Sequence, residues 1–539
     1  MAPAQWRGLG PLVLGARLRC YYITVARFYV QNFGCRATQA DGAAIERQFE
    51  ERGLERASAA GEAEIVVLNT CTVTAAADQD ARAAIRRVHR ENPLARIVVT
   101  GCYAQRSPEE LVTLPGVTEV IGNSHKHQLA EIAVPPRFGP GFGAVVEPFR
   151  AAEAPVPGGS SDGAFLPLSI LTTENRELRT ENQIHVSDIF AHTELLAAPV
   201  FDAANERTRP NLKVQDGCDN RCSFCVIPYV RGQSRSLKLE DVLGEANDLV
   251  EAGYRELVIS GINLGRWGRD LSVGSHQSSV VSELGAKADA QPTDDLRLTT
   301  LIRAILDRTA LEKLRLSSVE PMDWSDELIS LVAKSPRIAK HAHVPMQSGS
   351  DAVLRRMHRR YRPWHYREKI AKIRAAMPTA AIGADVMVGF PGETDAEFEE
   401  TRRAVEDLPL TYLHVFTYSA RPGTPAAHMP KHVPAPEARE RNRVLRELAA
   451  TKKRGFMRSF VGTTMQAITL RAGGRDAPVR NECGQGEVTE ALTDNYLKLH
   501  LEGRHQPNRW VHARVLRVED EALVGVAVTQ ARATPSANC

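Results

Sequence analysis

The sequence contains three closely spaced cysteines that could bind an iron–sulfur cluster. Cys218, Cys222 and Cys225 form a C-x3-C-x2-C pattern directly after the strand-like run 212–215. A cubane cluster contains four irons, so three thiolates leave one iron free to bind another molecule. A structural zinc site is the alternative, but zinc prefers four closed N or S ligands, and no histidine or fourth cysteine follows nearby. The pattern therefore predicts a cluster with an open iron, which is a reaction site.

Three more cysteines occupy equivalent positions in the first part of the chain. Cys35, Cys71 and Cys102 each follow a strand-like run, and the stretches 40–52 and 74–91 between them have helical periodicity. Such alternation predicts a parallel sheet, in which the carboxyl ends of the strands form one ligand crevice. Each cysteine could instead be a small buried residue. Their shared position at strand ends favours a second cluster with three protein ligands.

Strand–helix alternation resumes in the middle of the chain. We expect barrel strands at 212–215, 256–261, 313–319, 341–346, 382–388 and 412–418. Repeated units of this kind predict a partial or full parallel barrel, and such barrels bind substrates and cofactors at the carboxyl ends of their strands. The loop that carries Cys218 lies at one of those ends.

The last part of the chain changes its hydrophobic period. Residues 464–470, 492–501, 510–518 and 522–528 alternate in the manner of half-buried strands, which predicts a small antiparallel β-barrel. Barrels of this size often bind nucleic acid through one exposed face, although a structural cap is the alternative. Segment 431–539 contains 18 basic and 12 acidic residues, whereas the whole chain has a net charge of only +3. This local basic excess favours RNA as the partner.

A second basic segment lies within the predicted barrel. Residues 355–364 combine arginines with aromatic residues, a composition that suits phosphate contacts and base stacking. A solvated helix face is an equally good interpretation. The predicted RNA contacts are Arg355, Arg356, Arg359 and Arg360.

Composition and breaks in the pattern predict the domain organisation. An odd number of cysteines, nine, without a convincing secretory signal indicates a reducing compartment, and no apolar run approaches the roughly 18 residues of a membrane span. We therefore expect a cytoplasmic protein without a membrane partner. Residues 151–196 are rich in Pro, Gly, Ser, Thr and Glu, as is typical of a linker. The expected parts are an extension 1–22, an α/β domain 23–145, a linker 146–205, a barrel 206–430 with an insertion at 271–295, a connecting helix 431–460 and the small β-barrel 461–530.

Several short motifs together resemble one enzyme family. Residues 34–39 resemble the pattern Gly-Cys-x-x-Asn-Gln, with Thr38 in place of the usual Asn, and 216–218 and 227–232 flank the barrel cysteines as that family's pattern does. Further matches lie at 260–263, 317–321, 345–350 and 385–393. From Phe33 to Val528, apart from the two insertions, the chain resembles the radical S-adenosylmethionine (SAM) methylthiotransferases. The resemblance implies an α/β fold with an N-terminal open parallel domain, a central partial (β/α) radical SAM barrel and a C-terminal TRAM β-barrel.

The resemblance also implies the cofactors and the reaction. It implies two 4Fe–4S clusters, one on Cys218, Cys222 and Cys225 that binds SAM, and an auxiliary one on the N-terminal cysteines that supplies sulfur. Reductive cleavage of SAM would yield a 5′-deoxyadenosyl radical that abstracts hydrogen from C2 of a modified adenine, so no catalytic side chain is expected. An electron donor such as flavodoxin or ferredoxin is implied, and the sulfur donor is left open. The implied cofactor-binding residues are Ser260, Gly261, Asn263, Ser317, Gln347, Asp385 and Gly389.

Two signatures point to one branch of the family. Residues 69–74 and 101–105 resemble the branch that acts on N6-threonylcarbamoyladenosine next to the anticodon of tRNA. The alternatives are methylthiolation of isopentenyladenosine in tRNA or of a ribosomal-protein side chain. A non-catalytic iron–sulfur RNA-binding sensor is a third hypothesis, which predicts clusters without 5′-deoxyadenosine. The complete set of barrel motifs favours an enzyme.

Overall fold

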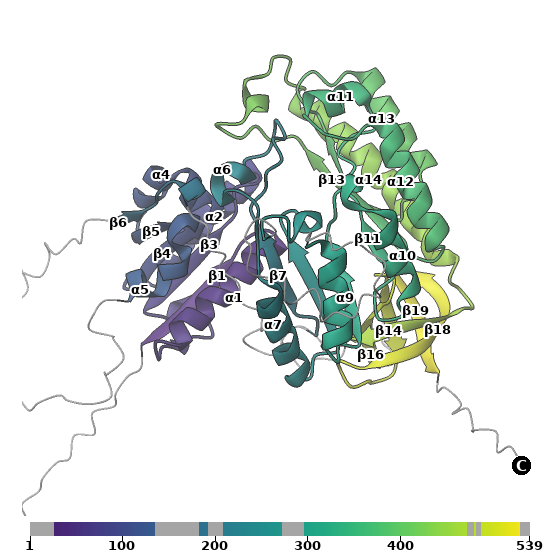
Figure 1. Ribbon diagram of the computed structural model, residues 1–539. Coiled ribbons are helices and arrows are strands. Elements are labelled where there is room, and N and C mark those ends of the chain that lie inside the picture. The colour runs from purple at the N-terminus through teal and green to yellow at the C-terminus, as the bar shows by residue number, and fades with distance from the viewer. Residues whose placement is uncertain are drawn as a thin grey trace, which may run out of the picture.

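A computed structural model describes residues 26–134, 183–191, 208–271, 296–471, 479–480 and 487–528. Its three parts confirm the predicted fold class: an open parallel α/β sheet, a parallel partial barrel and a small β-barrel (Figure 1). The predicted extension 1–22, nearly all of the insertion 271–295 and most of the linker lie outside the described residues. None of the described helices combines the length and the apolar character that crossing a membrane requires.

The N-terminal sheet is wholly parallel and has the strand order β2-β1-β3-β4-β5-β6. Its central strand β3 is buried at every position, because parallel sheets are covered by helices on both faces. Helices α1 and α5 cover one face and α2, α3 and α4 the other. The elements are β1 Arg27–Asn32, α1 Arg36–Glu50, β2 Glu55–Arg56, β3 Ile65–Thr70, α2 Ala75–Glu91, β4 Arg96–Gly101, α3 Cys102–Arg106, α4 Pro108–Val112, β5 Val117–Gly122, α5 Leu129–Ala133 and β6 Gln183–His185.

Strand β6 corrects part of the predicted linker. Gln183–His185 pairs in parallel with Glu119–Ile121 of β5 and so completes the N-terminal sheet. Three residues are too few to show a period of two, and the surrounding composition is polar, so the sequence pattern gave no signal for this strand.

The central barrel is open on one side. One sheet has the order β10-β9-β7-β8 and the other β11-β12-β13, and bridges Leu314–Ile338 and Ser318–His343 join them. Every pairing except that of the short strand β8 is parallel. Helix α1 of the N-terminal part packs against β7 at the open side. The elements are β7 Asn211–Asp216, α6 Ile227–Arg231, β8 Arg235–Ser236, α7 Leu239–Glu251, β9 Glu256–Gly261, α9 Leu298–Arg308, β10 Lys313–Leu316, α10 Asp326–Lys334, β11 His341–His343, α11 Asp351–Arg356, α12 Pro363–Ala376, β12 Ala381–Val388, α13 Asp395–Asp407 and β13 Tyr412–Thr417.

Helix α14, Ala435–Arg458, leads into the C-terminal barrel, which lies below the central barrel in yellow in Figure 1. Strand β14 pairs with both β16 and β18, which closes the barrel, and all pairings but β17–β19 are antiparallel. The strands are β14 Thr464–Thr469, β15 Val479–Arg480, β16 Glu487–Thr493, β17 Lys498–Glu502, β18 Trp510–Glu519 and β19 Ala522–Val528.

The single strand predicted at 492–501 is wrong. This stretch contains the end of β16, a tight turn and the start of β17. The Thr493 hydroxyl accepts a hydrogen bond from the amide of Leu497, and Tyr496 adopts a φ of 70°, so the chain reverses between them. Apolar residues alternate on both sides of the turn, and this alternation conceals it in the sequence.

Candidate functional site

The barrel cysteines lie on a loop that directly follows β7. Gly217 has a φ of 71°, and a Cβ atom there would lie 1.8 Å from the carbonyl oxygen of Gln233. Asp216 Oδ1 accepts a hydrogen bond from the Gly217 amide at 2.8 Å, and the Cys218 amide donates to the Gly232 carbonyl. The loop is therefore anchored at its start by the end of β7, which places the cysteines at the carboxyl ends of the barrel strands.

Polar groups surround the sulfur atoms of this triad. The Asn220 amide lies 3.4 Å and Asn263 Nδ2 lies 3.8 Å from Cys218 Sγ, and Arg359 Nη1 donates to Cys222 Sγ at 3.2 Å. Burial, with a smaller effect of Cys222, raises the pKa of the Cys225 thiol to about 12. A thiolate at this depth therefore requires bound cations, which iron ions would supply.

The N-terminal cysteines come together at the carboxyl ends of β1, β3 and β4. A Cβ atom on Gly34, next to Cys35, would lie 2.9 Å from Cys71 Sγ. Burial raises the pKa of Cys71 to about 12, and negative charge on Cys102 and Cys35 contributes to this shift. Cys102 begins α3, and Asn123 Nδ2 lies 3.7 Å from its sulfur. One crevice thus contains all three thiols, as the strand-end positions predict.

Neither triad has the spacing of a single-ion site. A tetrahedral zinc with Zn–S bonds of about 2.3 Å requires sulfur atoms roughly 3.8 Å apart. Among the described residues, three ligand atoms within 4.8 Å of one another occur at His343, Asp385 and His414, and not at the cysteines. The wider spacing of the cysteine triads fits a multinuclear cluster and disfavours zinc.

A buried ion network lies between the two triads. Arg231 on α6 donates to both carboxylate oxygens of Asp216 and to Asp41 of α1, and Lys126 and Lys213 also donate to Asp41. Burial alone would raise the pKa of Asp41, but the three cations outweigh it and hold this pKa well below its usual value. Three cations face two carboxylates, so the network carries a net positive charge, and Arg231 lies close enough to Cys102 and Cys35 to interact with them.

No local sequence pattern predicts this network. Asp216 and Arg231 lie in the motifs 216–218 and 227–232, but Asp41 and Lys126 are separated from them by many residues. Val226, the N-cap of α6, and Val230 within the helix pack against Cys102, so the two triads share one structural support.

Several predicted cofactor-binding residues carry polar atoms without partners. Ser260 Oγ, Asn263 Oδ1 and Ser317 Oγ are buried and have no hydrogen-bond partner among the described residues. Buried polar groups are normally paired, so these atoms fit a bound polar molecule. Gly261 leaves room for the Gln215 side chain, whose oxygen would lie 2.8 Å from a Cβ atom there.

The remaining predicted cofactor-binding residues differ in their surroundings. Gln347 has a φ of 61°, and its amide donates to the Asp385 carbonyl. The Asp385 side chain lies 3.1 Å from His343 Nε2. Gly389 faces α14, where a Cβ atom would lie 2.7 Å from that of Ala438. Helix packing therefore explains this glycine.

The four arginines of the predicted RNA contact separate into different environments. Arg359 is buried, pairs with Glu320 and donates to Cys222, so the prediction that it contacts RNA is replaced by a position at the barrel cysteines. Arg356 donates to both oxygens of Glu397. Arg355 is exposed and pairs with Asp351, and Arg360 is exposed. A basic run does not reveal which of its members point inward.

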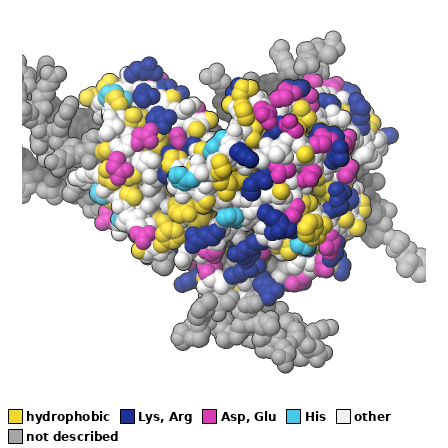
Figure 2. Space-filling view, turned by 90° about the horizontal axis from the view of Figure 1, so that it is seen from above, with side chains coloured by type: hydrophobic (Ala, Val, Ile, Leu, Met, Phe, Trp, Pro, Cys, Tyr) yellow, Lys and Arg dark blue, Asp and Glu magenta, His cyan; other side chains and the backbone are white. Residues whose placement is uncertain are grey.

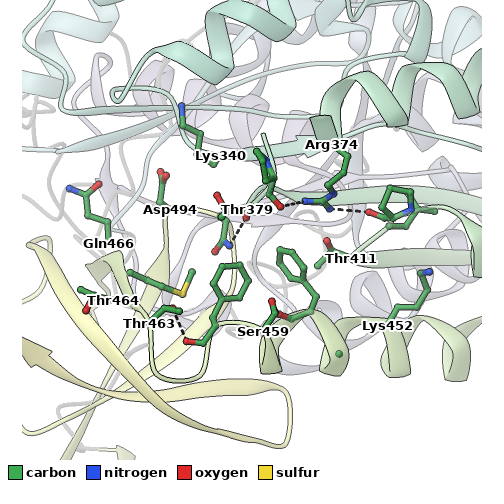
Figure 3. A pocket seen from close by; sticks show the side chains of 18 residues that line it. Lys340, Arg374, Thr379, Thr411, Lys452, Ser459, Thr463, Thr464, Gln466 and Asp494 are labelled. Atoms are coloured by element: carbon green, nitrogen blue, oxygen red, sulfur yellow. Dashed lines mark hydrogen bonds between the residues drawn. The ribbon is translucent and has the colours of Figure 1, made fainter. Parts of the chain in front are cut away.

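A large cavity lies away from the cysteines. Its volume is about 730 Å³, and it lies between the central barrel and the C-terminal barrel (Figure 3). Lys340, Arg374 and Lys452 line it, but each donates to backbone carbonyl oxygens. No cysteine lines this cavity, so it belongs to the boundary between the central and C-terminal barrels and not to the cysteine sites.

The surface shows no extended face of one charge in the view of Figure 2. Acidic and basic side chains are interspersed there, in keeping with the small net charge of +3. The face shown therefore carries no uniform field that would attract a polyanion.

Comparison with known proteins agrees with this geometry. Residues 27–122 match the model of "Uncharacterized protein family UPF0004", and residues 212–405 match that of the radical SAM superfamily. The chain is 33% identical over 470 residues to threonylcarbamoyladenosine tRNA methylthiotransferase MtaB of Bacillus subtilis, covering 87% of this chain and 89% of that protein. The protein of the same name in Aquifex aeolicus is 31% identical, with 90% and 99% covered. A tRNA-2-methylthio-N(6)-dimethylallyladenosine synthase of Endomicrobium trichonymphae is 28% identical, with 89% and 94% covered.

Proposed function

The chain belongs to the radical SAM methylthiotransferase family, and we propose that it methylthiolates C2 of N6-threonylcarbamoyladenosine next to the anticodon of tRNA. Radical SAM methylthiolation of a tRNA is common to both groups of relatives. The finer assignment is supported by the signatures at 69–74 and 101–105 and by the five relatives of 29–33% identity that are named for this nucleoside. Relatives named for dimethylallyladenosine follow at 28–30% identity, so isopentenyladenosine is the second candidate.

One observation carries the proposal: two cysteine triads flank α6 and the buried ion network of Arg231. In this proposal Cys218, Cys222 and Cys225 hold the 4Fe–4S cluster that binds SAM, and Cys35, Cys71 and Cys102 hold the auxiliary cluster. When bound, the clusters and SAM supply the radical that removes the C2 hydrogen, the sulfur atom and the methyl group. We also propose flavodoxin or ferredoxin as the electron donor.

The side chains around the barrel triad bind, orient and tune the cluster. Asn263 and Arg359 direct N–H groups at the cysteine sulfurs, and hydrogen bonds to ligand sulfurs tune a cluster. The unpartnered hydroxyls of Ser260 and Ser317 offer hydrogen bonds to the polar groups of SAM. No side chain is required as an acid or base.

The substrate enters through the open side of the barrel. Tyr412, His414 and Phe416 share one face of β13, and His414 and Phe416 are exposed although they lie within the barrel sheet. Exposed side chains on the inner face of a strand leave room for a nucleoside between the sheets. The C-terminal barrel is attached at this side, where it supports contacts to the remainder of the tRNA.

The test compares two RNAs. Protein reconstituted anaerobically with iron and sulfide is incubated with reductant, SAM and tRNA that carries either threonylcarbamoyladenosine or isopentenyladenosine, and the nucleosides are measured by mass spectrometry. The proposal predicts a methylthio adduct on the threonylcarbamoyl nucleoside and little on the other. The reverse preference would move the chain to the second candidate, and clusters without 5′-deoxyadenosine would support a sensor.

A further inference from the structure

Arg36 lies where the three parts of the molecule meet. It is the first residue of α1 and directly follows Cys35 of the N-terminal triad. Its Nη2 atom donates to the hydroxyl of Tyr496, in the turn between β16 and β17, at 3.1 Å. Its carbonyl oxygen accepts a hydrogen bond from Asn211 at the start of β7. The guanidinium is thus held at the open side of the barrel, one residue from a proposed cluster ligand.

The charge of Arg36 has no acidic partner among the described residues. Its neighbours Arg209 and Arg315 both pair with Glu256, whereas the guanidinium of Arg36, within the described part of the chain, donates its one side-chain hydrogen bond to the neutral Tyr496 hydroxyl. Arg36 is only partly exposed. A partly buried guanidinium that lacks a carboxylate is costly unless a ligand supplies one.

Arg36 also faces open space. It lines a cavity of about 330 Å³ together with Gln39 and Arg209. A second cavity, of about 460 Å³, shares Arg209 with the first and is lined by Tyr412, His414 and Tyr496. Both cavities are lined by Arg209 and Leu470, and the second lies between β13, helix α14 and the C-terminal barrel.

The positive charge of Arg36 acts on two histidines, His341 of β11 and His414 of β13. Burial, and then Arg315, lowers the pKa of His341 well below its usual value, and Arg36 contributes to this shift. The ring of His414 is exposed only in part, and its partial desolvation lowers the pKa of His414, with a smaller effect from His343 and Arg36. Neutral histidines do not compete with a guanidinium for an anion. Arg209 and Lys453 also line these cavities, but they pair with Glu256 and Glu521, whereas Arg36 keeps its charge available for an anionic group.

We propose that Arg36 binds the carboxylate at the end of the amino-acid side chain on the target adenosine and so selects the threonylcarbamoyl nucleoside. This inference rests on the proposed function. A planar guanidinium matches a carboxylate with two parallel hydrogen bonds. An isopentenyl group is apolar and would leave the guanidinium desolvated without a partner, so the same residue both attracts one nucleoside and rejects the other.

Tyr496 is a positioning residue in this arrangement. Its ring packs against His341 at a centroid distance of 4.6 Å, and the guanidinium of Arg315 lies 5.4 Å from its centre. These contacts fix its hydroxyl next to Arg36 and couple the placement of the guanidinium to the docking of the C-terminal barrel.

The test varies the protein and the substrate together. Wild type, Arg36→Gln and Arg36→Lys are assayed with threonylcarbamoyladenosine tRNA and with the same tRNA after methyl esterification of the side-chain carboxylate. Because each change leaves one charged group without its partner, we expect Arg36→Gln and esterification each to lower kcat/KM by about 100-fold. Because both changes remove the same interaction, their combination should cost little more than either alone.

Arg47→Gln is the matched control. Arg47 lies on the same helix and pairs with Glu245 of the barrel domain at 3.3 Å, so its variant reports the loss of an α1 arginine at the domain seam. It should retain wild-type kcat/KM. Iron content and RNA-independent 5′-deoxyadenosine formation should be equal in all variants, which separates substrate recognition from damage at Cys35.

Four outcomes are distinct. Non-additive losses support the proposal. Additive losses overturn it, because Arg36 would then act on a phosphate or on the fold, and unchanged kcat/KM in Arg36→Gln overturns it as well. If wild type modifies only isopentenyladenosine tRNA, the proposed function fails first, and this inference fails with it.

Discussion

Asp41→Asn perturbs the ion network that joins the N-terminal sheet to the barrel. Asp41 is buried and accepts hydrogen bonds from Lys126, Lys213 and Arg231, which come from both parts of the chain. The variant keeps the shape of the side chain but leaves three buried cations with one carboxylate, that of Asp216. Among the described residues, these contacts join elements up to 190 positions apart in sequence.

The expected magnitude follows from the cost of an unpaired buried charge. Removal of one partner from a buried ion pair destabilises a protein by about 3–5 kcal/mol. Since 1.4 kcal/mol corresponds to a factor of ten, local opening of the seam between α1 and β7 should become about 100- to 4,000-fold more frequent.

Hydrogen exchange measures this opening directly. Amides of α1 and β7 should exchange faster by this factor in Asp41→Asn, whereas amides of the C-terminal barrel should keep their rates. Asp248→Asn, which changes an exposed aspartate on α7, is the control. If α1 and β7 exchange in Asp41→Asn within about threefold of the control, the network does not hold the seam and the reasoning is refuted.

Three further predictions concern the same groups and the predicted RNA surface. The cations hold the pKa of Asp41 and Asp216 low against the opposing effect of burial, so their stabilisation is complete above the unfolded pKa. Exchange at the seam, corrected for its intrinsic pH dependence, should stay constant from pH 8 to about pH 5 and accelerate only below about pH 4. Arg359→Gln removes a positive donor from Cys222 Sγ and should shift the midpoint potential of the barrel cluster to more negative values, measured by redox titration against Arg360→Gln; an equal potential would contradict the tuning role. Replacement of Arg355 and Arg360 by Gln should weaken tRNA binding and reduce its salt slope by about one per residue, and unchanged binding would favour a solvated face.

The architecture was predictable because its signals are local and repeated. Apolar runs such as 65–70 and 96–101 are short and continuous, as buried parallel strands require, and the cysteines that follow them lie in one crevice. The pattern failed where a strand is too short to show a period, as in Gln183–His185, and where alternation continues across a turn, as at Tyr496.

The site was predictable only in part, because side-chain partners come from distant segments. The cysteine spacing identifies candidate ligands, but no local pattern tells that Arg231 reaches Asp41. Arg359 and Arg360 are neighbours in one basic run, yet one is buried at Cys222 and the other is exposed. The direction in which a side chain on a helix or loop points depends on packing, and packing cannot be read from composition.

Division of labour between the two cysteine triads is the central claim, and Cys222→Ala and Cys71→Ala test it most directly. After anaerobic reconstitution, each variant is incubated with reductant, SAM and threonylcarbamoyladenosine tRNA, and 5′-deoxyadenosine and the thiolated nucleoside are measured in the same sample. We expect neither product from Cys222→Ala, and 5′-deoxyadenosine without thiolated nucleoside from Cys71→Ala. Thiolated nucleoside from Cys71→Ala would contradict the role of the N-terminal triad as the site of sulfur transfer.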